Sequence, residues 1–148
     1  MPVLVFDFGM KFIGVAVAEP RAGTATALTT IKALAGRPQW HALDTIHADW
    51  RPEAMIVGLP LNMDDSESKM SNAARRFGRQ LEARFALPVH FADERLTTFE
   101  AKQRVSQRVS QPGSRRQRRG DRAGVKDVHA AAAQIIAETW LSELNADS

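Results

Sequence analysis

The chain has 148 residues, of which 44% are hydrophobic and 25% are charged. This length fits one domain with a buried core, and the composition is that of a folded protein rather than a disordered one. No apolar run approaches the ~20 residues that a membrane-spanning helix needs, so we expect no membrane association. Cysteine is absent. That absence excludes disulfides and thiolate metal ligands, and we expect a protein of the reducing cytoplasm.

The positive charge is concentrated in one part of the chain. Between Lys102 and Lys126, nine Lys or Arg residues stand against a single acid, Asp121, which gives this stretch a charge of +8. Because the whole chain carries +3, the remainder carries −5. Such asymmetry indicates a polyanionic partner that is contacted through one segment, and nucleic acid is the partner we expect.

The first part of the chain predicts three strands. Residues Pro2 to Phe8 form an almost continuous apolar run, typical of a strand buried on both faces. Gly9 interrupts the run, and Ile13 to Ala18 resumes it with β-branched residues, which predicts a hairpin. Thr24 to Ile31 is rich in threonine and predicts a neighbouring strand.

A helix is expected next, because Pro38 suits a first helical turn and apolar residues then recur at helical spacing. We expect both Trp40 and Trp50 of this helix to lie in the core rather than to stack on bases. Residues 54–58 and 88–92 predict two further short strands, and an amphipathic helix is predicted between them over residues 70–85.

The last third of the chain predicts two helices separated by a loop. Thr97 to Glu100 has the spacing of a capping box, which predicts a helix that runs to about Val109. Ser110 to Gly124 combines glycines and a proline with five arginines and predicts a flexible basic loop. Helical periodicity then returns over Val125 to Leu144. The core-facing residues expected in that helix are Val128, Ala131, Ala132, Ile135 and Ile136.

Together these elements predict an α/β fold over residues 1–148, organised as a single domain with a flexible basic loop at about 110–124. The expected architecture is a mixed sheet of about five strands flanked by helices on both faces.

Three acidic positions stand out against this background. Asp7 ends a buried strand, where a carboxylate is costly unless a cation or a hydrogen-bond donor lies beside it; it can also simply cap the turn at Gly9. Asp93 and Glu94 follow a second buried strand, although a solvated strand end paired with Arg95 explains them better when they are taken alone. Asp127 opens the last helix, where the helix dipole alone favours an acid.

The alanine run 130–133 bears on the third acid. Four small residues would let this helix approach the sheet closely and bring Asp127 to the strand ends, or they reflect helix propensity alone. Acids at two strand ends and one helix start can meet at one edge of a sheet. Oxygen ligands without thiolates suit Mg²⁺ or Mn²⁺, and such a cluster next to an arginine-rich loop fits phosphodiester hydrolysis.

Four blocks of sequence resemble the YqgF (RuvX) family, whose members are described as pre-16S ribosomal RNA nucleases and as Holliday junction resolvases. The blocks are Asp7-Phe8-Gly9-Met10-Lys11-Phe12-Ile13-Gly14-Val15-Ala16, Val57-Gly58-Leu59-Pro60-Leu61-Asn62-Met63-Asp64, Asp93-Glu94-Arg95-Leu96-Thr97-Thr98, and Val125-Lys126-Asp127 with the alanines that follow. They occur in order and span nearly the whole chain. The resemblance implies an RNase H-like fold, a divalent-metal nuclease with Mg²⁺ or Mn²⁺, and a role in ribosomal RNA maturation.

By this resemblance, Asp7, Glu94 and Asp127 are the catalytic residues and metal ligands. Strand alternation puts Asp93 and Glu94 on opposite faces, and only the resemblance selects Glu94, with Asp93 as its substitute. Met10 and Phe12 stand where the family usually has Thr and Arg, so Lys11 is the only basic residue left in the first loop. Related junction resolvases carry a further acid near the strand that ends at Gly58, and this chain has Gly-Leu-Pro there.

Several residues are expected to contact nucleic acid, most of them by phosphate contact. They are Lys11, Asn62, Arg95, Arg115, Arg116, Arg118, Arg119 and Arg122. His90 and His129 are better explained as structural residues than as metal ligands.

The sequence leaves three functions open. The first is a nuclease that processes the 5′ end of pre-16S ribosomal RNA, with structured RNA as substrate and ribosomal precursor particles as partners. The second is a Holliday junction resolvase that acts on DNA. The third is a non-catalytic RNA-binding factor for ribosome assembly or transcription. Phosphate contacts and metal ligands do not reveal whether a 2′-hydroxyl is recognised.

Overall fold

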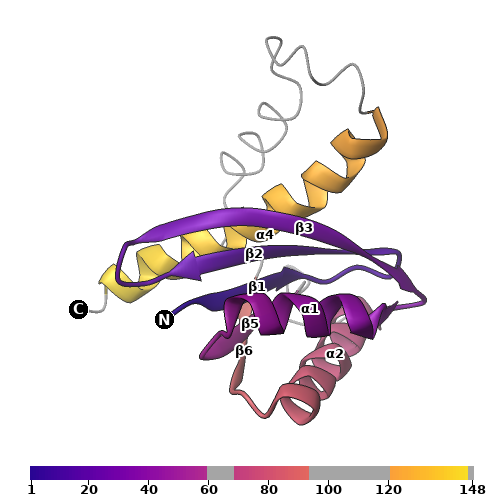
Figure 1. Ribbon diagram of the computed structural model, residues 1–148, viewed down its shortest axis with the longest axis horizontal. Coiled ribbons are helices and arrows are strands. Elements are labelled where there is room, and N and C mark those ends of the chain that lie inside the picture. The colour runs from indigo at the N-terminus through magenta and orange to yellow at the C-terminus, as the bar shows by residue number, and fades with distance from the viewer. Residues whose placement is uncertain (60–68, 94–120, 147–148) are drawn as a thin grey trace.

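A computed structural model describes residues 1–59, 69–93 and 121–146 of the chain (Figure 1). The described strands are β1 (Val3–Asp7), β2 (Phe12–Glu19), β3 (Thr24–Leu34), β4 (Arg37–Pro38), β5 (Ala54–Leu59) and β6 (Val89–Asp93). The described helices are α1 (Trp40–Trp50), α2 (Lys69–Phe85) and α4 (Asp121–Ala146). The helix expected from Thr97 to about Val109 lies outside the described residues.

The six strands form one mixed sheet in the order β4-β3-β2-β1-β5-β6. Strands β1 to β4 pair antiparallel with their neighbours in sequence, whereas β1–β5 and β5–β6 pair parallel. The carboxyl ends of β1, β5 and β6 therefore lie side by side, at what we call the carboxyl edge of the sheet. Strand β3 runs in the same direction as β1 and ends there too. The α/β fold with helices on both faces is confirmed.

Two apolar layers cover the two faces of the sheet, as Figure 1 shows for their helices. Alternate residues of β1 divide between them: Leu4 and Phe6 face α1 and α2, and Val3 and Val5 face α4. The first layer contains large side chains, including Phe77 of α2, whose ring meets that of Phe6 edge to face at 5.5 Å. The α4 layer consists largely of smaller side chains, among them Ala16, Ala18, Ala133 and Ala137.

Pro38 is not in the first turn of a helix, as the sequence had predicted. It pairs with Ala33 in the two-residue strand β4, which adds a sixth strand to the expected five, and α1 begins at Trp40 after the N-cap residue Gln39. A proline has no N–H to donate, and an edge strand tolerates that loss because one of its sides has no neighbour.

Two of the expected core residues are exposed. Trp50, at the end of α1, is 41% exposed, while Trp40 packs partly buried against the larger apolar layer. Val128 is 36% exposed, because the N-terminal turns of α4 project past the sheet edge (Figure 1). Further along α4, Ile135 and Ile136 are buried as expected. No helix in the described part of the chain has the length and apolar character to cross a membrane.

An ion pair fastens α1 to α2 on the surface. Arg84 donates from Nε and from a terminal nitrogen to the two carboxylate oxygens of Asp44, at 2.8 and 2.7 Å. The same guanidinium lies 5.1 Å from the ring centroid of Trp40. One side chain of α2 thus contacts two residues one helical turn apart on α1.

Replacing Asp44 by Asn should lower the free energy of unfolding at pH 7. The hydrogen bonds from Arg84 hold the pKa of the Asp44 carboxyl below its ordinary value of 3.8. A carboxyl with a lowered folded-state pKa contributes stability above its unfolded pKa and loses it as the pH falls through the folded value. Urea unfolding should therefore separate Asp44→Asn from wild type at pH 7 and bring the two together in strongly acid solution.

Asp49→Asn is the matched control, since Asp49 is an exposed acid of the same helix and forms no ion pair with the described residues. Equal losses in the two variants at pH 7 would show that the Asp44–Arg84 pair does not stabilise the packing of α1 on α2.

Candidate active site

Asp7 is the last residue of β1 and lies half-buried at the carboxyl edge of the sheet. Its position continues the alternation of Val3 and Val5, which places it on the face that α4 covers. Its partner across the antiparallel β1–β2 ladder is Gly14. Asp7 therefore does end a buried strand, as predicted, and it lies on the α4 face of the sheet.

The loop after Asp7 is tight, as expected from Gly9. A Cβ at Gly9 would collide with the carbonyl oxygen of Phe12, so only glycine fits this close approach of the backbone to itself. Space, rather than a positive φ, is the reason for glycine here, because Gly9 is not among the residues with positive φ. The loop therefore turns immediately after the carboxylate and leads directly into β2.

Helix α4 touches the sheet at Gly14, the residue opposite Asp7. A Cβ on Gly14 would collide with the carbonyl oxygen of His129 and lie 3.0 Å from the nitrogen of Ala130. Ala130 and Ala133 are buried at 5% and 0% exposure. The close approach that the alanine run predicted is confirmed, and it needs a glycine on the strand as well as alanines on the helix.

Asp127 belongs to the same part of α4, two residues before His129. Because a helix rises ~1.5 Å per residue, its backbone lies within a few ångströms of the point where α4 meets Gly14. The structure thus brings the chain segment that carries Asp127 to the strand position paired with Asp7. The Asp127 side chain itself lies outside the described part of the structure.

The ring of His129 stacks on that of Phe12, with centroids 5.0 Å apart and an interplanar angle of 25°. Desolvation by burial lowers the pKa of His129 below its ordinary value, which favours the neutral ring. This stack gives Phe12 and His129 a structural role. No local sequence pattern predicts this stack, because the two residues are more than a hundred positions apart.

Asp93 lies on the wrong face of the sheet to replace Glu94. In β6, Val89 and Phe91 pack on the α1/α2 side, whereas Ala92 packs on the α4 side. Asp93 follows the alternation of Phe91, so it sits opposite to the face of Asp7. This position removes Asp93 as the substitute ligand. Glu94 lies outside the described residues.

Of the residues expected to bind nucleic acid, the structure describes Lys11, which is exposed in the loop after Asp7. The other expected contacts lie outside the described residues: Asn62, Arg95, Arg115, Arg116, Arg118 and Arg119. Arg122 lies within α4, and its side chain is outside the described part as well. Among the described side chains no three His, Asp or Glu residues form a group that would hold a metal ion, and His90 is an exposed residue of β6.

Comparison with known proteins identifies the family and several similar relatives. Residues 1–143 match the family described as "RuvX: Holliday junction resolvase". A protein of Azotobacter vinelandii is 48% identical over 95% of this chain and 93% of its own length, and one of Pseudomonas putida is 47% identical over 94% and 93%. Both carry the name "Putative pre-16S rRNA nuclease".

Junction resolvases are among the solved structures with a similar fold. Thermus thermophilus RuvC in complex with a Holliday junction substrate has a TM-score of 0.51 at 21% identity, over 94% of this chain and 92% of that one. The fowlpox virus resolvase in complex with Holliday junction DNA has a TM-score of 0.57 at 12% identity, over 97% and 99%. At these identities the likeness establishes the fold, which is that of the RuvC-like, RNase H-like proteins.

Gly14→Ala should destabilise the protein, because the added Cβ meets the backbone of α4 and no side chain can rotate away to make room. Overpacking of this kind costs about 1–3 kcal/mol. Urea unfolding would measure the loss, and amide exchange should rise in α4 around His129 as the helix is pushed from β2.

Gly14→Ala/His129→Ala is the informative control. It removes the imidazole ring but keeps the carbonyl oxygen of residue 129, so the double variant should regain no stability. If Gly14→Ala has wild-type stability and exchange, the close approach of α4 to β2 does not matter for the fold.

Proposed function

This chain belongs to the RuvX family, and on that premise we propose that it is a divalent-metal-dependent nuclease that processes the 5′ end of pre-16S ribosomal RNA. The observation that carries the proposal is the packing at Gly14. It brings the helix segment that bears Asp127 against the strand pair that holds Asp7, at the carboxyl edge of the sheet.

Asp7, Glu94 and Asp127 are the proposed catalytic residues. Support for Glu94 over Asp93 comes from the strand pattern, since Asp93 lies on the α1/α2 face and Asp7 on the α4 face.

The carboxylate oxygens of the three proposed catalytic residues suit a hard cation. Carboxylate oxygens are the ligands that Mg²⁺ and Mn²⁺ prefer, and a chain without cysteine offers them no competing thiolate. Asp7, Glu94 and Asp127 would hold the ion on the α4 side of the sheet edge. Bound there, Mg²⁺ or Mn²⁺ would lower the pKa of a water molecule and offset charge on the phosphodiester. The half-buried position of Asp7 limits competing water around its carboxylate.

The remaining residues proposed to bind substrate are cations and one amide. Lys11 lies four residues after Asp7, in the β1–β2 loop, and is exposed. Asn62, Arg95 and the arginines at 115, 116, 118, 119 and 122 are proposed on sequence alone, as contacts to phosphates. A polyanionic substrate would offset the repulsion among these arginines.

The names of the relatives support RNA as the substrate. Ribosomal precursor particles as partners and the cytoplasm as the place of action are part of the same proposal. The family description and the DNA-bound neighbours of similar fold favour a second candidate, cleavage of a DNA junction. Matched substrates separate the two: a precursor RNA with a 5′ extension and a four-way DNA junction, each incubated with Mg²⁺ or Mn²⁺. Preferential cleavage of the RNA supports the proposal, and preferential cleavage of the junction supports the alternative.

Asp7→Asn should abolish hydrolysis of whichever substrate is cleaved, because it removes a charged metal ligand. The loss should exceed the ~10–100-fold that is typical when only an outer-shell partner of a metal ligand is removed. The fold should be intact or slightly more stable, since clustered carboxylates repel one another without a cation. Initial rates with saturating Mg²⁺ and a thermal unfolding curve measure the two effects.

Asp93→Asn is the matched control, because it removes the same charge at the end of β6, two strands from β1 and on the opposite face, and should keep most of the activity. Equal loss in both variants would show that charge at this edge matters, rather than ligation on the α4 face. Wild-type activity in Asp7→Asn would refute the catalytic assignment. If the wild-type protein binds RNA without hydrolysing it, the remaining function is that of a non-catalytic RNA-binding factor.

A further inference from the structure

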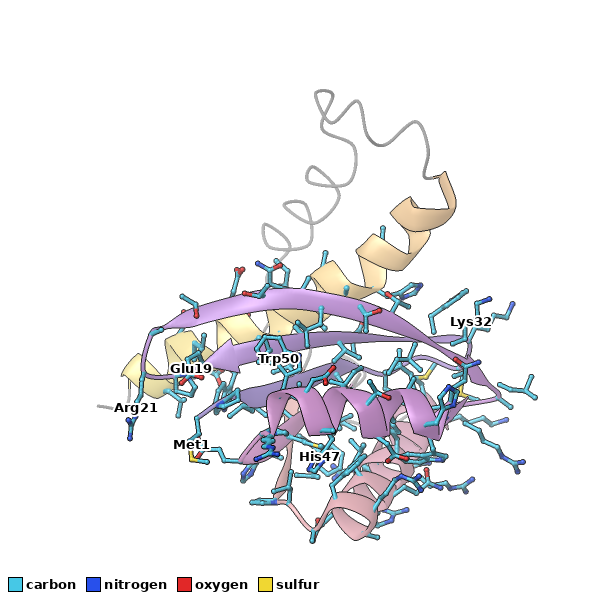
Figure 2. The ribbon with its side chains drawn as sticks, viewed as in Figure 1. Met1, Glu19, Arg21, Lys32, His47 and Trp50 are labelled. Carbon is cyan, nitrogen blue, oxygen red and sulfur yellow. The ribbon has the colours of Figure 1, made fainter. Side chains whose placement is uncertain are left out.

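An exposed basic hairpin tip lies at the same sheet edge as Asp7. It comprises Lys32 to Arg37, the end of β3 with β4 and the turn between them. Because β3 runs in the direction of β1, both strands end at this edge. Figure 2 shows Lys32 at this end of β3 and Arg21 at the other end of the sheet.

The exposed side chains of the tip lie on the same face as Asp7. Lys32 is the ladder partner of Phe12, whose ring meets His129 of α4, so Lys32 is on the α4 face. Leu34 is two residues further along β3 and therefore shares that face, and Arg37 is its partner in β4. Ala33, between them, packs against the opposite apolar layer.

The tip is held rigidly against the loop that follows Asp7. Ala33 donates its N–H to the carbonyl oxygen of Lys11 at 2.8 Å, and Gly36 donates to that of Met10 at 2.9 Å. Gly36 has a φ of +81°, a conformation that strains any residue with a side chain, and a Cβ there would also be crowded at 3.1 Å from the Phe8 ring and 3.2 Å from the Met10 sulfur. The loop after Asp7 and the hairpin tip thus form one rigid unit, and Lys11 lies beside the tip.

The local charge is positive without compensation from nearby sequence. Residues 8–18 and 20–43 contain no Asp or Glu. Lys11, Lys32 and Arg37 are all exposed, and none of them forms an ion pair with a described residue. Leu34 is 80% exposed in their midst.

Protection of a sheet edge explains part of this composition, since charges and prolines on an edge strand discourage pairing with other chains. It does not explain Leu34, because an exposed leucine at an edge promotes such pairing. Cations around an exposed apolar side chain are what a nucleic acid requires, with phosphates for the charges and a base face for the apolar group.

We propose that Lys32 and Arg37 bind backbone phosphates of the substrate and that Leu34 packs against an unpaired or unstacked base. This inference rests on the proposed function, because it takes the substrate to be nucleic acid, and it extends the substrate site beyond the acids. Three strand spacings of ~4.8 Å separate β1 from β4, about 14 Å in all. At ~3.4 Å per nucleotide of a duplex strand, the tip contacts the substrate about four nucleotides from the cleaved bond.

The test is the salt dependence of binding by the full chain without divalent metal. The probe is a fluorescein-labelled RNA hairpin with a single-stranded 5′ extension, followed by fluorescence anisotropy. Each phosphate contact adds about 0.7–0.9 to the slope of log affinity against log salt. Lys32→Ala/Arg37→Ala should therefore reduce the slope by about 1.4–1.8.

Arg21→Ala/Arg51→Ala is the control of equal charge. Both arginines are exposed at the opposite edge, Arg21 in the β2–β3 turn and Arg51 just before β5, so this variant should keep the wild-type slope. Equal reductions in the two double variants would overturn the proposal, since net charge would then account for the effect. An unchanged slope in Lys32→Ala/Arg37→Ala would overturn it as well.

Leu34→Ser tests the apolar contact separately. It should weaken binding about three- to tenfold, as expected for a partial loss of base contact, without changing the slope. Unfolding should be unaffected because the side chain is 80% exposed. Wild-type affinity in Leu34→Ser would refute the base contact. If the wild-type protein binds the RNA but does not cleave it, the proposed nuclease activity is refuted and the hairpin contacts are not. The salt slopes measure those contacts independently of cleavage.

Discussion

The backbone contact between α4 and β2 at Gly14 is the constraint on which the rest of the site depends. A hydrogen atom at this position allows the carbonyl oxygen of His129 to approach the strand more closely than any side chain would permit. Gly14 is also the ladder partner of Asp7. One missing methyl group therefore sets how near the last helix comes to the first-strand carboxylate.

The two layers of the sheet differ in thickness for a related reason. Phenylalanine, leucine and methionine side chains fill the α1/α2 layer, whereas alanines dominate the contact with α4. A helix over small residues lies closer to the sheet, so the α4 face is the one where helix and strand residues can share a cation. Asp7 lies on this face, and Asp93 on the other.

Backbone hydrogen bonds join the loop after Asp7 to the β3–β4 hairpin tip. Two carbonyl oxygens of the loop after Asp7 accept N–H groups from Ala33 and Gly36 at the β3–β4 turn. The Met10 side chain lies against Gly36, and the Phe12 ring stacks on that of His129. Met10 and Phe12 thus support the loop by contact, and Lys32 and Arg37 are exposed cations nearby.

The sequence by itself determined the α/β class, most strand and helix positions, and Asp7 at a buried strand end. These features depend on local patterns: apolar runs, helical periodicity and a glycine after an acid. Its errors were local as well. Pro38 resembles a helix start, and only the pairing with Ala33 shows that it is an edge strand.

Only the tertiary structure decided which faces Asp7 and Asp93 occupy, that His129 stacks on Phe12, and that Lys32, Leu34 and Arg37 share the face of Asp7. Such relations follow from strand register and from the docking of a helix more than a hundred residues away. A shift of one residue in register would reverse every face, and no local pattern encodes that choice.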